Sequence, residues 1–517
     1  MFKRILIANR GEIAVRVIRA CRELGVESVA IYSEADRAAL HVREADYAVG
    51  VGPAPASESY LKTERIIEAA TKTGAEAIHP GYGFFSENAG FATAVEKSGL
   101  VFIGPSPAAI RKMGDKVEAR KVMATAGVPV VPGSPGTLAG EAEVRAAAAR
   151  IGYPIMLKAA AGGGGKGLRF VEKEAELPSA MRAVGGEAKS SFGDARLYVE
   201  KFLSRPRHIE FQVLADRAGK TVQVFERECS IQRRHQKVVE ESPSPFITPA
   251  MRRAMGEVAI KAAQAVGYFS AGTIEFLADA DRNFYFLEMN TRIQVEHPIT
   301  EMVTGVDLVK AQIEVAAGAP LPFSQQDLSQ RGWAVECRIY AEDPAAGFAP
   351  APGRIDTLRW PSGPGVRNDA GVYAGAEVPV FYDPMISKLA VWGRDRAEEI
   401  ARMRRALGEF VIAGELTTNL DFHRWLMRHP LFLRGDYDTN FIEQEYHPRA
   451  RAGTSGGDGK PDQDDNDREF IAAMLAVAAA AQNPGNGRGA EAAGAGRGAA
   501  RAGSAWKTLG RLDVLRR

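Results

Sequence analysis

The chain has 517 residues, of which 45% are hydrophobic and 25% are charged, and this length and balance predict a globular protein of several domains. Its formal net charge is +2, so no basic field favours nucleic acid as a partner. The three cysteines, Cys21, Cys229 and Cys337, are far apart in the sequence, which argues against a disulfide framework or a structural zinc site and fits a reducing cytoplasm.

The first residues, MFKRILIANRGE, are basic and then apolar, as in a signal peptide. The apolar run Ile5–Ala8 is too short for one, and charged residues follow at once. No run of 18 apolar residues occurs anywhere, so we expect no membrane span. The N-terminal segment is therefore predicted to be the first strand of the fold.

The N-terminal region alternates between strand and helix patterns. Apolar strand patterns occur at residues 3–8, 27–33, 45–51 and 75–79, and helical periodicity occurs at 13–25 and 64–74. This alternation predicts a parallel sheet with ligands at the carboxyl ends of its strands. The loop at 79–83, HPGYG, follows a strand and is a predicted site position.

Residues 153–170, YPIMLKAAAGGGGKGLRF, contain four consecutive glycines close to Lys158 and Lys166. The apolar residues 155–157 and 168–171 predict two strands of a hairpin, with the glycines at its tip. Glycine lets backbone N–H groups approach an anion, and the two lysines suggest a phosphate chain. A dinucleotide-binding loop would open a helix, and a P-loop needs Ser or Thr where Gly167 stands, so we reject both. By itself the run is also compatible with a flexible linker.

Residues 286–298, FLEMNTRIQVEHP, are rich in polar side chains at alternate positions. If the chain stays extended, one side carries Glu288, Asn290, Arg292, Gln294 and Glu296. Upstream, Glu275 stands among apolar residues. Carboxylate and amide oxygens suit Mg²⁺, so the metal candidates are Glu275, Glu288 and Asn290. The alternative is an amphipathic strand with a solvated face.

Two further segments are candidates for binding anions or nucleotide. Residues 226–243 concentrate the positive charges of Arg233, Arg234, His235 and Lys237, which predicts an anion site or, alternatively, a charge-rich loop. Within this segment Cys229 is either a buried small side chain or a perturbed thiol near Lys237. In residues 198–212, Glu200 and the backbone of Lys201 to Leu203 are candidates for contact with a purine edge, and a plain linker is the alternative.

The composition changes after residue 446. Residues 447–517 are polar and acidic at first and then rich in glycine and alanine, which predicts a low-complexity and largely disordered tail. A solvated tail and a docking peptide for a partner both fit its basic end.

Eleven motifs together resemble the biotin carboxylases of the ATP-grasp superfamily, in the order of that family. They are IANRGEIAVR, HPGYGFFSEN, FIGPS, MGDK, LKAAAGGGGKG, VEKFL, RHIEFQ, ERECSIQRRHQKVVEE, EMNTRIQVEHPITE, AVECRIYAEDP and YDPMISKLAVWG. The resemblance covers about residues 1–446. It implies a multi-domain fold of α/β and α+β type: a pre-ATP-grasp α/β domain (1–113), an ATP-grasp domain (114–330) with a mobile lid at about 131–203, and a biotin carboxylase C-terminal domain (331–446).

The resemblance also implies a reaction, the carboxylation of biotin by bicarbonate through carboxyphosphate with consumption of ATP and with Mg²⁺ or Mn²⁺. By resemblance, Glu296 deprotonates bicarbonate, which Lys237, Arg292, Gln294 and the Val295 backbone hold. Arg338 stabilises the biotin enolate, and Tyr82 contacts biotin. The matching ATP-binding positions are Lys116, Lys158, Gly164, Gly165, Glu200, Lys201, Leu203, His208, Gln232 and His235. The matching metal positions are Glu275 and Glu288, with Asn290 as a third candidate.

The chain departs from the resemblance in two ways. Lys166 stands where many relatives have Arg, which should leave phosphate binding intact. No Met-Lys dipeptide, the core of a biotinylation motif, occurs. We therefore expect a cytoplasmic, homodimeric biotin carboxylase that works with a separate biotin carboxyl carrier protein and separate carboxyltransferase subunits.

The final acceptor is not identified by these motifs. Acetyl-CoA, for fatty acid synthesis, is the expectation, and propionyl-CoA or pyruvate are the alternatives. Another ATP-grasp ligase and a non-catalytic interaction protein are the other functions to separate. Neither of these two predicts the full set of motifs and site residues.

Overall fold

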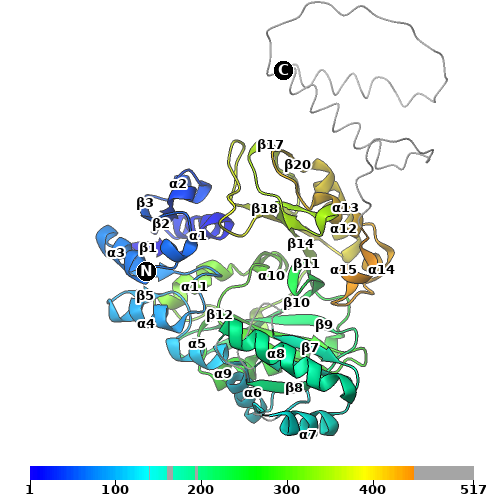
Figure 1. The fold of residues 1–517 in the computed structure, drawn as a ribbon. Helices are drawn as coiled ribbons and strands as arrows, with labels where there is room; N and C mark the ends of the chain where they lie inside the picture. The colour runs from blue at the N-terminus through cyan, green and yellow to red at the C-terminus, as the bar shows by residue number, and fades with distance from the viewer. Residues whose placement is uncertain (135, 139, 160–166, 193–195, 448–517) are drawn as a thin grey trace, which may run out of the picture. The chain divides into compact units, whose positions relative to one another are not determined.

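The computed structural model describes residues 1–447 with the exception of residues 135, 139, 160–166 and 193–195 (Figure 1). The glycine run with Gly164, Gly165 and Lys166 lies outside the described residues, as does the predicted tail beyond residue 447. The three cysteines are free and buried. Among the described helices, none is both long and apolar enough to cross a lipid bilayer.

The N-terminal residues form a parallel sheet, which confirms the prediction from alternating strands and helices. Its order within the described residues is β3-β2-β1-β4-β5, and all neighbours are parallel. The strands are β1 (Arg4–Ile7), β2 (Glu27–Ser33), β3 (Tyr47–Gly52), β4 (Ala77–His79) and β5 (Val101–Phe102). The helices are α1 (Gly11–Glu23), α2 (Leu40–Glu44), α3 (Thr63–Thr73) and α4 (Ala89–Lys97).

Helix α1 begins and ends earlier than its periodicity predicts. It starts at Gly11 and ends at Glu23, whereas the pattern predicts a helix over 13–25. Gly25 has a φ of +69°, the left-handed conformation that glycine adopts at helix ends. The early start matters for the site, because it places Glu12 in the first turn of the helix.

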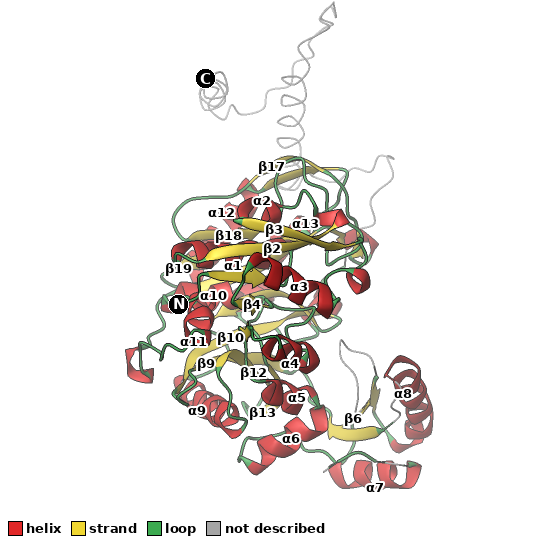
Figure 2. Ribbon diagram, turned by 90° about the vertical axis from the view of Figure 1, so that its left-hand side faces the viewer, coloured by secondary structure: helices red, strands yellow, loops and turns green. Residues whose placement is uncertain are grey.

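A small three-stranded sheet contains the two strands that flank the glycine run (Figure 2). Its order is β7-β6-β8, and β6 pairs with β7 in antiparallel fashion, which confirms the predicted hairpin strands. The strands are β6 (Ile155–Ala159), β7 (Leu168–Val171) and β8 (Leu197–Lys201), covered by α7 (Glu141–Ile151) and α8 (Leu177–Phe192). This unit has its own apolar core, and α5 (Pro107–Gly114) and α6 (Lys116–Thr125) precede it.

A larger antiparallel sheet runs through the rest of the described chain. Its eight strands have the order β13-β12-β9-β10-β11-β14-β19-β18. They are β9 (Arg207–Ala215), β10 (Thr221–Arg233), β11 (Gln236–Ser242), β12 (Ser270–Ala278), β13 (Phe284–Asn290), β14 (Trp333–Tyr340), β18 (Val366–Ala370) and β19 (Met385–Gly393). Because β11 pairs with β14, this sheet continues across the predicted boundary between residues 330 and 331.

The half of this sheet near β9 and β12 has one apolar and one polar face. On β9, Ile209 and Phe211 pack with α9 (Pro249–Ala265), whereas His208 and Glu210 alternate with them on the opposite face. Side chains of a strand alternate between its two faces, so the apolar packing under α9 forces these polar groups to the other side. Two further helices, α10 (His297–Thr304) and α11 (Leu308–Ala316), follow β13.

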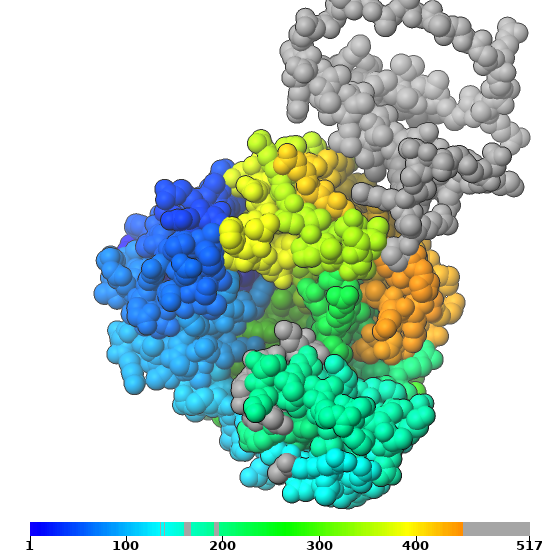
Figure 3. Space-filling model, in the orientation of Figure 1, coloured from blue at the N-terminus to red at the C-terminus, as the bar shows by residue number. Residues whose placement is uncertain are grey.

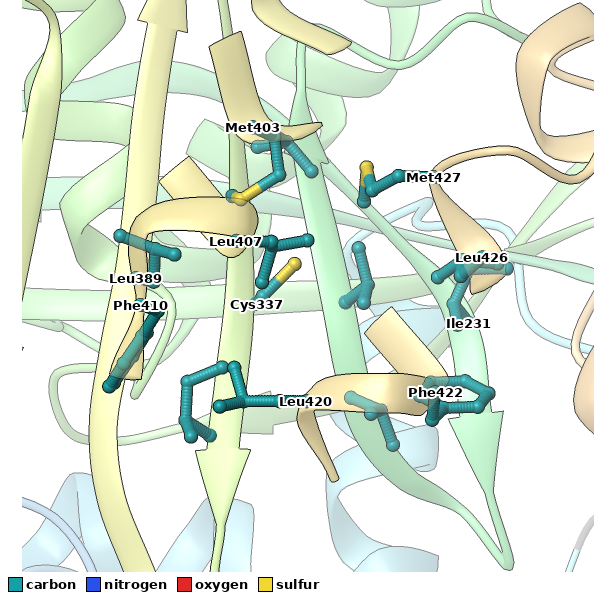
Figure 4. Packing of buried hydrophobic residues seen from close by; sticks show 14 of the residues in the cluster. Ile231, Cys337, Leu389, Met403, Leu407, Phe410, Leu420, Phe422, Leu426 and Met427 are labelled. Atoms are coloured by element: carbon teal, nitrogen blue, oxygen red, sulfur yellow. The ribbon is translucent and has the colours of Figure 1, made fainter. Parts of the chain in front are cut away.

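The other half of the sheet is also apolar on one face (Figure 4). Val239, Cys337 and Leu389 are neighbours in register on β11, β14 and β19, and they pack with Met403 and Leu407 of the covering helix. The remaining elements here are β15 (Glu342–Asp343), β16 (Ala349–Pro350), β17 (Ile355–Arg359), β20 (Val411–Gly414), α12 (Arg396–Glu409), α13 (Leu420–Leu426), α14 (Pro430–Arg434) and α15 (Phe441–Glu445). The opposite face therefore receives the charged residues that alternate with this core.

Candidate active site

The ammonium group of Lys237, on β11, lies on the polar face of the large sheet, and its side chain is 11% exposed. Its Nζ donates to Glu275 Oε1 at 2.8 Å and to Glu296 Oε1 at 2.7 Å, and it also pairs with Glu210. Burial acts to lower the pKa of Lys237, but these carboxylates raise it well above its ordinary value. Lys237 is therefore charged and binds three acidic groups from separate parts of the chain.

Both oxygens of the Glu296 carboxylate are held by cations. Oε1 accepts from Lys237, and Oε2 accepts from an Nη of Arg338 at 2.9 Å. The Nε of Arg338 donates to Glu240 Oε1 at 2.6 Å. Burial acts to raise the pKa of Glu296, but the charges of Lys237 and Arg338 outweigh it and hold the pKa well below 4.5. An anionic substrate that paired with Lys237 and Arg338 would weaken their interaction with Glu296. The pKa of Glu296 would then rise, and Glu296 would be a better proton acceptor.

Arg292 connects the residues around the turn that follows β13. Its guanidinium donates to Asn290 Oδ1 at 2.9 Å, to Gln294 Oε1 at 2.8 Å and to Glu87 Oε2 at 2.9 Å. Burial acts to lower the pKa of Arg292, but the nearby carboxylates, Glu87 first among them, raise it. The result is a fixed, charged fork beside Glu296, a geometry that suits a planar oxyanion.

Glu275 and Glu288, two of the metal candidates, are direct partners across β12 and β13. Glu275 accepts from Asn290 and Gln294 at 2.7 and 2.9 Å, and burial, which would raise its pKa, is outweighed by Lys237 and His208, so the pKa is lowered. In contrast, burial and the charge of Glu275 raise the pKa of Glu288. A divalent cation between the two carboxylates would relieve this repulsion, so the donor set fits Mg²⁺.

Some of the predicted nucleotide-binding residues contact one another or the metal candidates. Gln232 donates to His208 Nδ1 at 2.6 Å, which leaves His208 Nε2 to donate to Glu275 at 2.7 Å. Burial and then the charge of Lys158 lower the pKa of His235.

The lysines of this set have different surroundings. Lys158 pairs with Glu200 at 2.5 Å, and Lys116 lies 4.0 Å from Glu288. The side chain of Lys201 donates to the carbonyls of Gly152 and Tyr153, so it is committed to the small sheet. The backbone N–H groups of Lys201 and Phe202 donate to the carbonyls of Pro132 and Pro154 at 2.7 and 3.2 Å, so the contact of this backbone with a purine edge stays a prediction.

A cavity of about 570 Å³ opens beside Glu296. Its lining includes Arg292, Val295 and Arg338 from the charged cluster, and Tyr82 from the HPGYG loop. Figure 3 shows this face of the described chain hollowed between the blue N-terminal residues, the yellow-green residues of the C-terminal half and the teal small sheet. The predicted biotin contacts Tyr82 and Arg338 thus share one cavity, although they are far apart in the sequence.

The prediction that residues 288–296 stay extended is wrong. Strand β13 ends at Asn290, and the chain then turns and enters α10 at His297. Arg292 reaches both Asn290 and Gln294 because of this turn and not because of strand alternation. The polar groups converge as predicted, but through a different backbone path.

The positive cluster predicted at 226–243 also differs from the structure. The segment forms the hairpin of β10 and β11, and Arg233 pairs with Glu342 at 3.0 Å instead of facing Lys237. Cys229 lies with its Sγ 3.9 Å from Glu296, and burial raises its pKa well above 9, which favours the interpretation as a buried thiol. Of the four predicted basic side chains, only Lys237 pairs with Glu210, Glu275 and Glu296.

Several residues of the site were not predicted from the sequence. Glu210 and Arg227 form a buried ion pair beside Lys237, and Glu240 orients Arg338. A signal was present, since Glu210 stands between Ile209 and Phe211 in a strand pattern, and a charged residue among apolar strand residues is often buried and paired. Its partner could not be read from the sequence.

Three family models match the chain in succession. Residues 1–110 match the biotin carboxylase N-terminal domain, residues 115–324 match the ATP-binding domain of the carbamoyl-phosphate synthase L chain, and residues 336–444 match the biotin carboxylase C-terminal domain.

Relatives of established name are similar over most of the chain. A pyruvate carboxylase subunit of Methanothermobacter thermautotrophicus is 56% identical over 86% of this chain and 90% of its own length. Biotin carboxylase 1 of Bacillus subtilis is 53% identical over 86% of this chain and 98% of its own length. The propionyl-CoA carboxylase alpha chain of Ruegeria pomeroyi is 52% identical over 86% of this chain and 68% of its own length.

Solved structures show the same fold. A biotin carboxylase complex with β,γ-ATP from Campylobacter jejuni aligns with a TM-score of 0.83 and 49% identity, covering 86% of this chain and 99% of that one. The biotin carboxylase domain dimer of the Hydrogenobacter thermophilus 2-oxoglutarate carboxylase, in complex with MgADP, ADP and bicarbonate, aligns with a TM-score of 0.82 and 49% identity, covering 86% and 97%.

Proposed function

Because the chain belongs to the biotin carboxylase family, we propose that the described cavity carries out the ATP-dependent carboxylation of biotin by bicarbonate. The observation that carries the proposal is the position of Glu296. Its carboxylate is held ionised between Lys237 and Arg338, and Arg338 lines a cavity that Tyr82 also lines. A base, an anion site and a biotin contact therefore adjoin one another, which the reaction requires.

In the proposed first step, Glu296 accepts the proton of bicarbonate. Lys237, Arg292, Gln294 and the Val295 N–H hold the resulting carbonate, whose oxygen attacks the γ-phosphorus of ATP and displaces ADP. The O–P bond that forms gives carboxyphosphate. The charged fork of Arg292 is already aligned by Asn290 and Gln294, so the anion meets an ordered site.

In the second step, carboxyphosphate breaks into CO2 and phosphate. The phosphate takes the ureido proton of biotin, and the biotin nitrogen then attacks CO2 to form carboxybiotin. Arg338 faces the cavity and stabilises the negative oxygen of the biotin enolate, while Tyr82 contacts the ring. Glu240 keeps the Arg338 guanidinium in place for this role.

The nucleotide site lies on the side of Glu275 and the small sheet. We propose that Lys116, Lys158, Glu200, Lys201, Leu203, His208, Gln232 and His235 hold ATP, together with Gly164 and Gly165 outside the described residues. Glu275 and Glu288, with Asn290, would hold Mg²⁺ or Mn²⁺, which neutralises phosphate charge when bound. Glu288 is the carboxylate with free capacity, since its near charged neighbour Lys116 is 4.0 Å away.

The half-reaction is tested by ADP release from the purified chain with Mg²⁺ and bicarbonate, with and without free biotin. Strong stimulation by biotin supports the proposal. If stimulation is absent although ATP binds, the assay is repeated with a biotinylated carrier protein. No stimulation by either form of biotin would contradict the proposal and favour another ATP-grasp ligase.

We further propose the domains 1–113, 114–330 and 331–446, with a lid at about 131–203, and the ranges of the three family models support these boundaries. A homodimer is proposed because a similar structure is named as a biotin carboxylase domain dimer. Light scattering of the purified chain tests this, and a monomer at all concentrations would contradict it.

For the complete reaction we propose that biotin is carried by a separate biotin carboxyl carrier protein and that carboxyltransferase subunits pass the carboxyl group to acetyl-CoA. Propionyl-CoA and pyruvate are the alternatives, and the names of the relatives include both kinds of carboxylase. Purification of the tagged chain with its partners, followed by labelled bicarbonate and each acceptor in turn, decides between them.

A further inference from the structure

The side chain of Lys388, on β19, is completely buried below the cavity. Its Nζ donates to the carbonyl oxygen of Val295 at 2.8 Å. The same Nζ lies 3.2 Å from Glu12 Oε2 and 5.7 Å from the centre of the Tyr82 ring. A buried ammonium group is costly unless it is paired, so Lys388 is held where these partners can meet it.

The contact with Val295 acts on the backbone directly before Glu296. The carbonyl of Val295 and the N–H of Glu296 belong to one planar peptide unit, so a bond to the carbonyl fixes the whole unit. The preceding unit is fixed as well, because His297 Nδ1 donates to the carbonyl of Gln294 at 2.7 Å. The N–H of Val295 is part of that preceding unit.

Three parts of the chain therefore meet at the ammonium group of Lys388. Glu12 comes from α1 of the N-terminal region, Lys388 comes from the C-terminal half of the large sheet, and Val295 comes from the turn before α10. Glu12 is itself 5% exposed and lines the cavity, and its Oε2 pairs with Lys388 Nζ at 3.2 Å. Burial raises the pKa of Glu12 to about 7, and the charge of Lys388 acts in the opposite direction.

We infer that Lys388, supported by Glu12, is a positioning residue that sets the Val295–Glu296 peptide and so aims the base and the bicarbonate site at each other. The inference rests on the proposed function, because the role is defined by bicarbonate. Lys388 does not touch the reacting atoms in this account. It acts through the backbone of Val295 and through its position beside Tyr82.

The test compares Lys388→Met, which keeps the length of the side chain and removes its charge, with the wild type. We expect kcat/KM for bicarbonate to fall about 100-fold, the scale associated with a small misplacement of catalytic groups. The dissociation constant for ATP should stay within about threefold, because no nucleotide candidate among the described residues contacts Lys388. Glu12→Gln should change the same parameter in the same direction by a smaller factor.

The matched control is Arg396→Met. Arg396 forms an ion pair with Glu241 at 2.7 Å on the apolar side of the same sheet, so this variant also loses a charge pair, which is partly buried. It should lower the melting temperature and leave KM for bicarbonate unchanged. If Lys388→Met does not fold, the double variant Lys388→Met/Glu12→Gln removes both charges of the pair and leaves no unpaired charge.

Two results would overturn the inference: unchanged bicarbonate kinetics in Lys388→Met, or equal losses of bicarbonate and ATP affinity. A wild type without biotin-stimulated ATP hydrolysis would instead show that the proposed function fails. In that case a crystal structure of the Lys388→Met variant still tests the positioning role, because this measurement does not depend on enzyme activity. We expect the Val295–Glu296 peptide to be turned, and an unchanged peptide would contradict the positioning role.

Discussion

The Nζ of Lys237 lies 2.7 Å from Oε1 of Glu296, whose side chain is buried, while that of Lys237 is partly buried. This pair keeps the base ionised and keeps the cation charged, although burial opposes each charge. The ligand-free site is therefore a balanced set of charges. An entering anion competes with Glu296 for Lys237 and Arg338, and this competition is what gives Glu296 the basicity its role needs.

Replacement of Glu296 by Gln should abolish proton abstraction and keep the side-chain shape. We expect the bicarbonate-dependent ATP hydrolysis rate to fall by about 10²–10⁴, the usual contribution of a general base. ATP binding should persist, because no nucleotide candidate relies on Glu296. The control is Glu342→Gln, which also removes a carboxylate from an ion pair, but from the pair with Arg233 and not from Lys237 or Arg338. A similar loss in both variants would contradict the assignment.

Replacement of Arg338 by Gln should stop carboxylation of biotin while ATP binding persists. Arg338→Lys should not restore the activity, because Arg338 uses two different nitrogens, Nε for Glu240 and an Nη for Glu296, and a single ammonium cannot reproduce this fork. The measurements are biotin-stimulated ADP release and nucleotide affinity. Loss of ATP affinity in Arg338→Gln would mean that the proposed enolate role is wrong.

Replacement of Glu288 by Gln should selectively weaken the binding of the metal ion. Glu288 is the candidate ligand whose pKa is raised by burial and by Glu275, so its charge is the one that a divalent cation would stabilise. We expect the Mg²⁺ concentration for half-maximal activity to rise at least tenfold, with partial recovery in Glu288→Asp. A titration with Mg²⁺ at fixed ATP measures this. An unchanged midpoint would remove Glu288 from the metal site.

The stability of the protein should fall on acidification between about pH 6.5 and pH 4. Burial lowers the pKa of His41, His79 and His423 to about 4, so the folded state keeps them neutral while the unfolded chain binds protons below its pKa of 6.5. Their contribution is therefore present above pH 6.5 and is lost towards pH 4, with an upper limit of about 3 kcal/mol for each.

Urea unfolding at a series of pH values measures this dependence. His423→Gln keeps a donor for the Arg338 carbonyl and should make the pH slope shallower. The exposed His447, replaced by Gln, is the control and should leave the slope unchanged. Equal slopes in the wild type and in His423→Gln would contradict the assignment of His423.

Much of the local structure could be predicted from the sequence. The apolar runs at 27–33 and 155–157 became strands β2 and β6, because short apolar segments between turn residues need partners on both sides. The flanks of the glycine run formed the predicted hairpin. The site residues were predicted from the resemblance. In the structure Tyr82 and Arg338 line one cavity, and Arg338 donates to Glu296.

The partners of the charged residues were decided by the tertiary structure alone. Val239 and Glu240 lie on opposite faces of β11 because successive side chains of a strand alternate. Only the packing of the sheet decides that the face of Val239 meets the apolar core and that Glu240 meets Arg338. The same holds for Lys388, whose partners Glu12 and Val295 stand far away in the chain. Local periodicity determines which residues share a face, and only the folding of distant strands and turns onto one another determines which charges meet there.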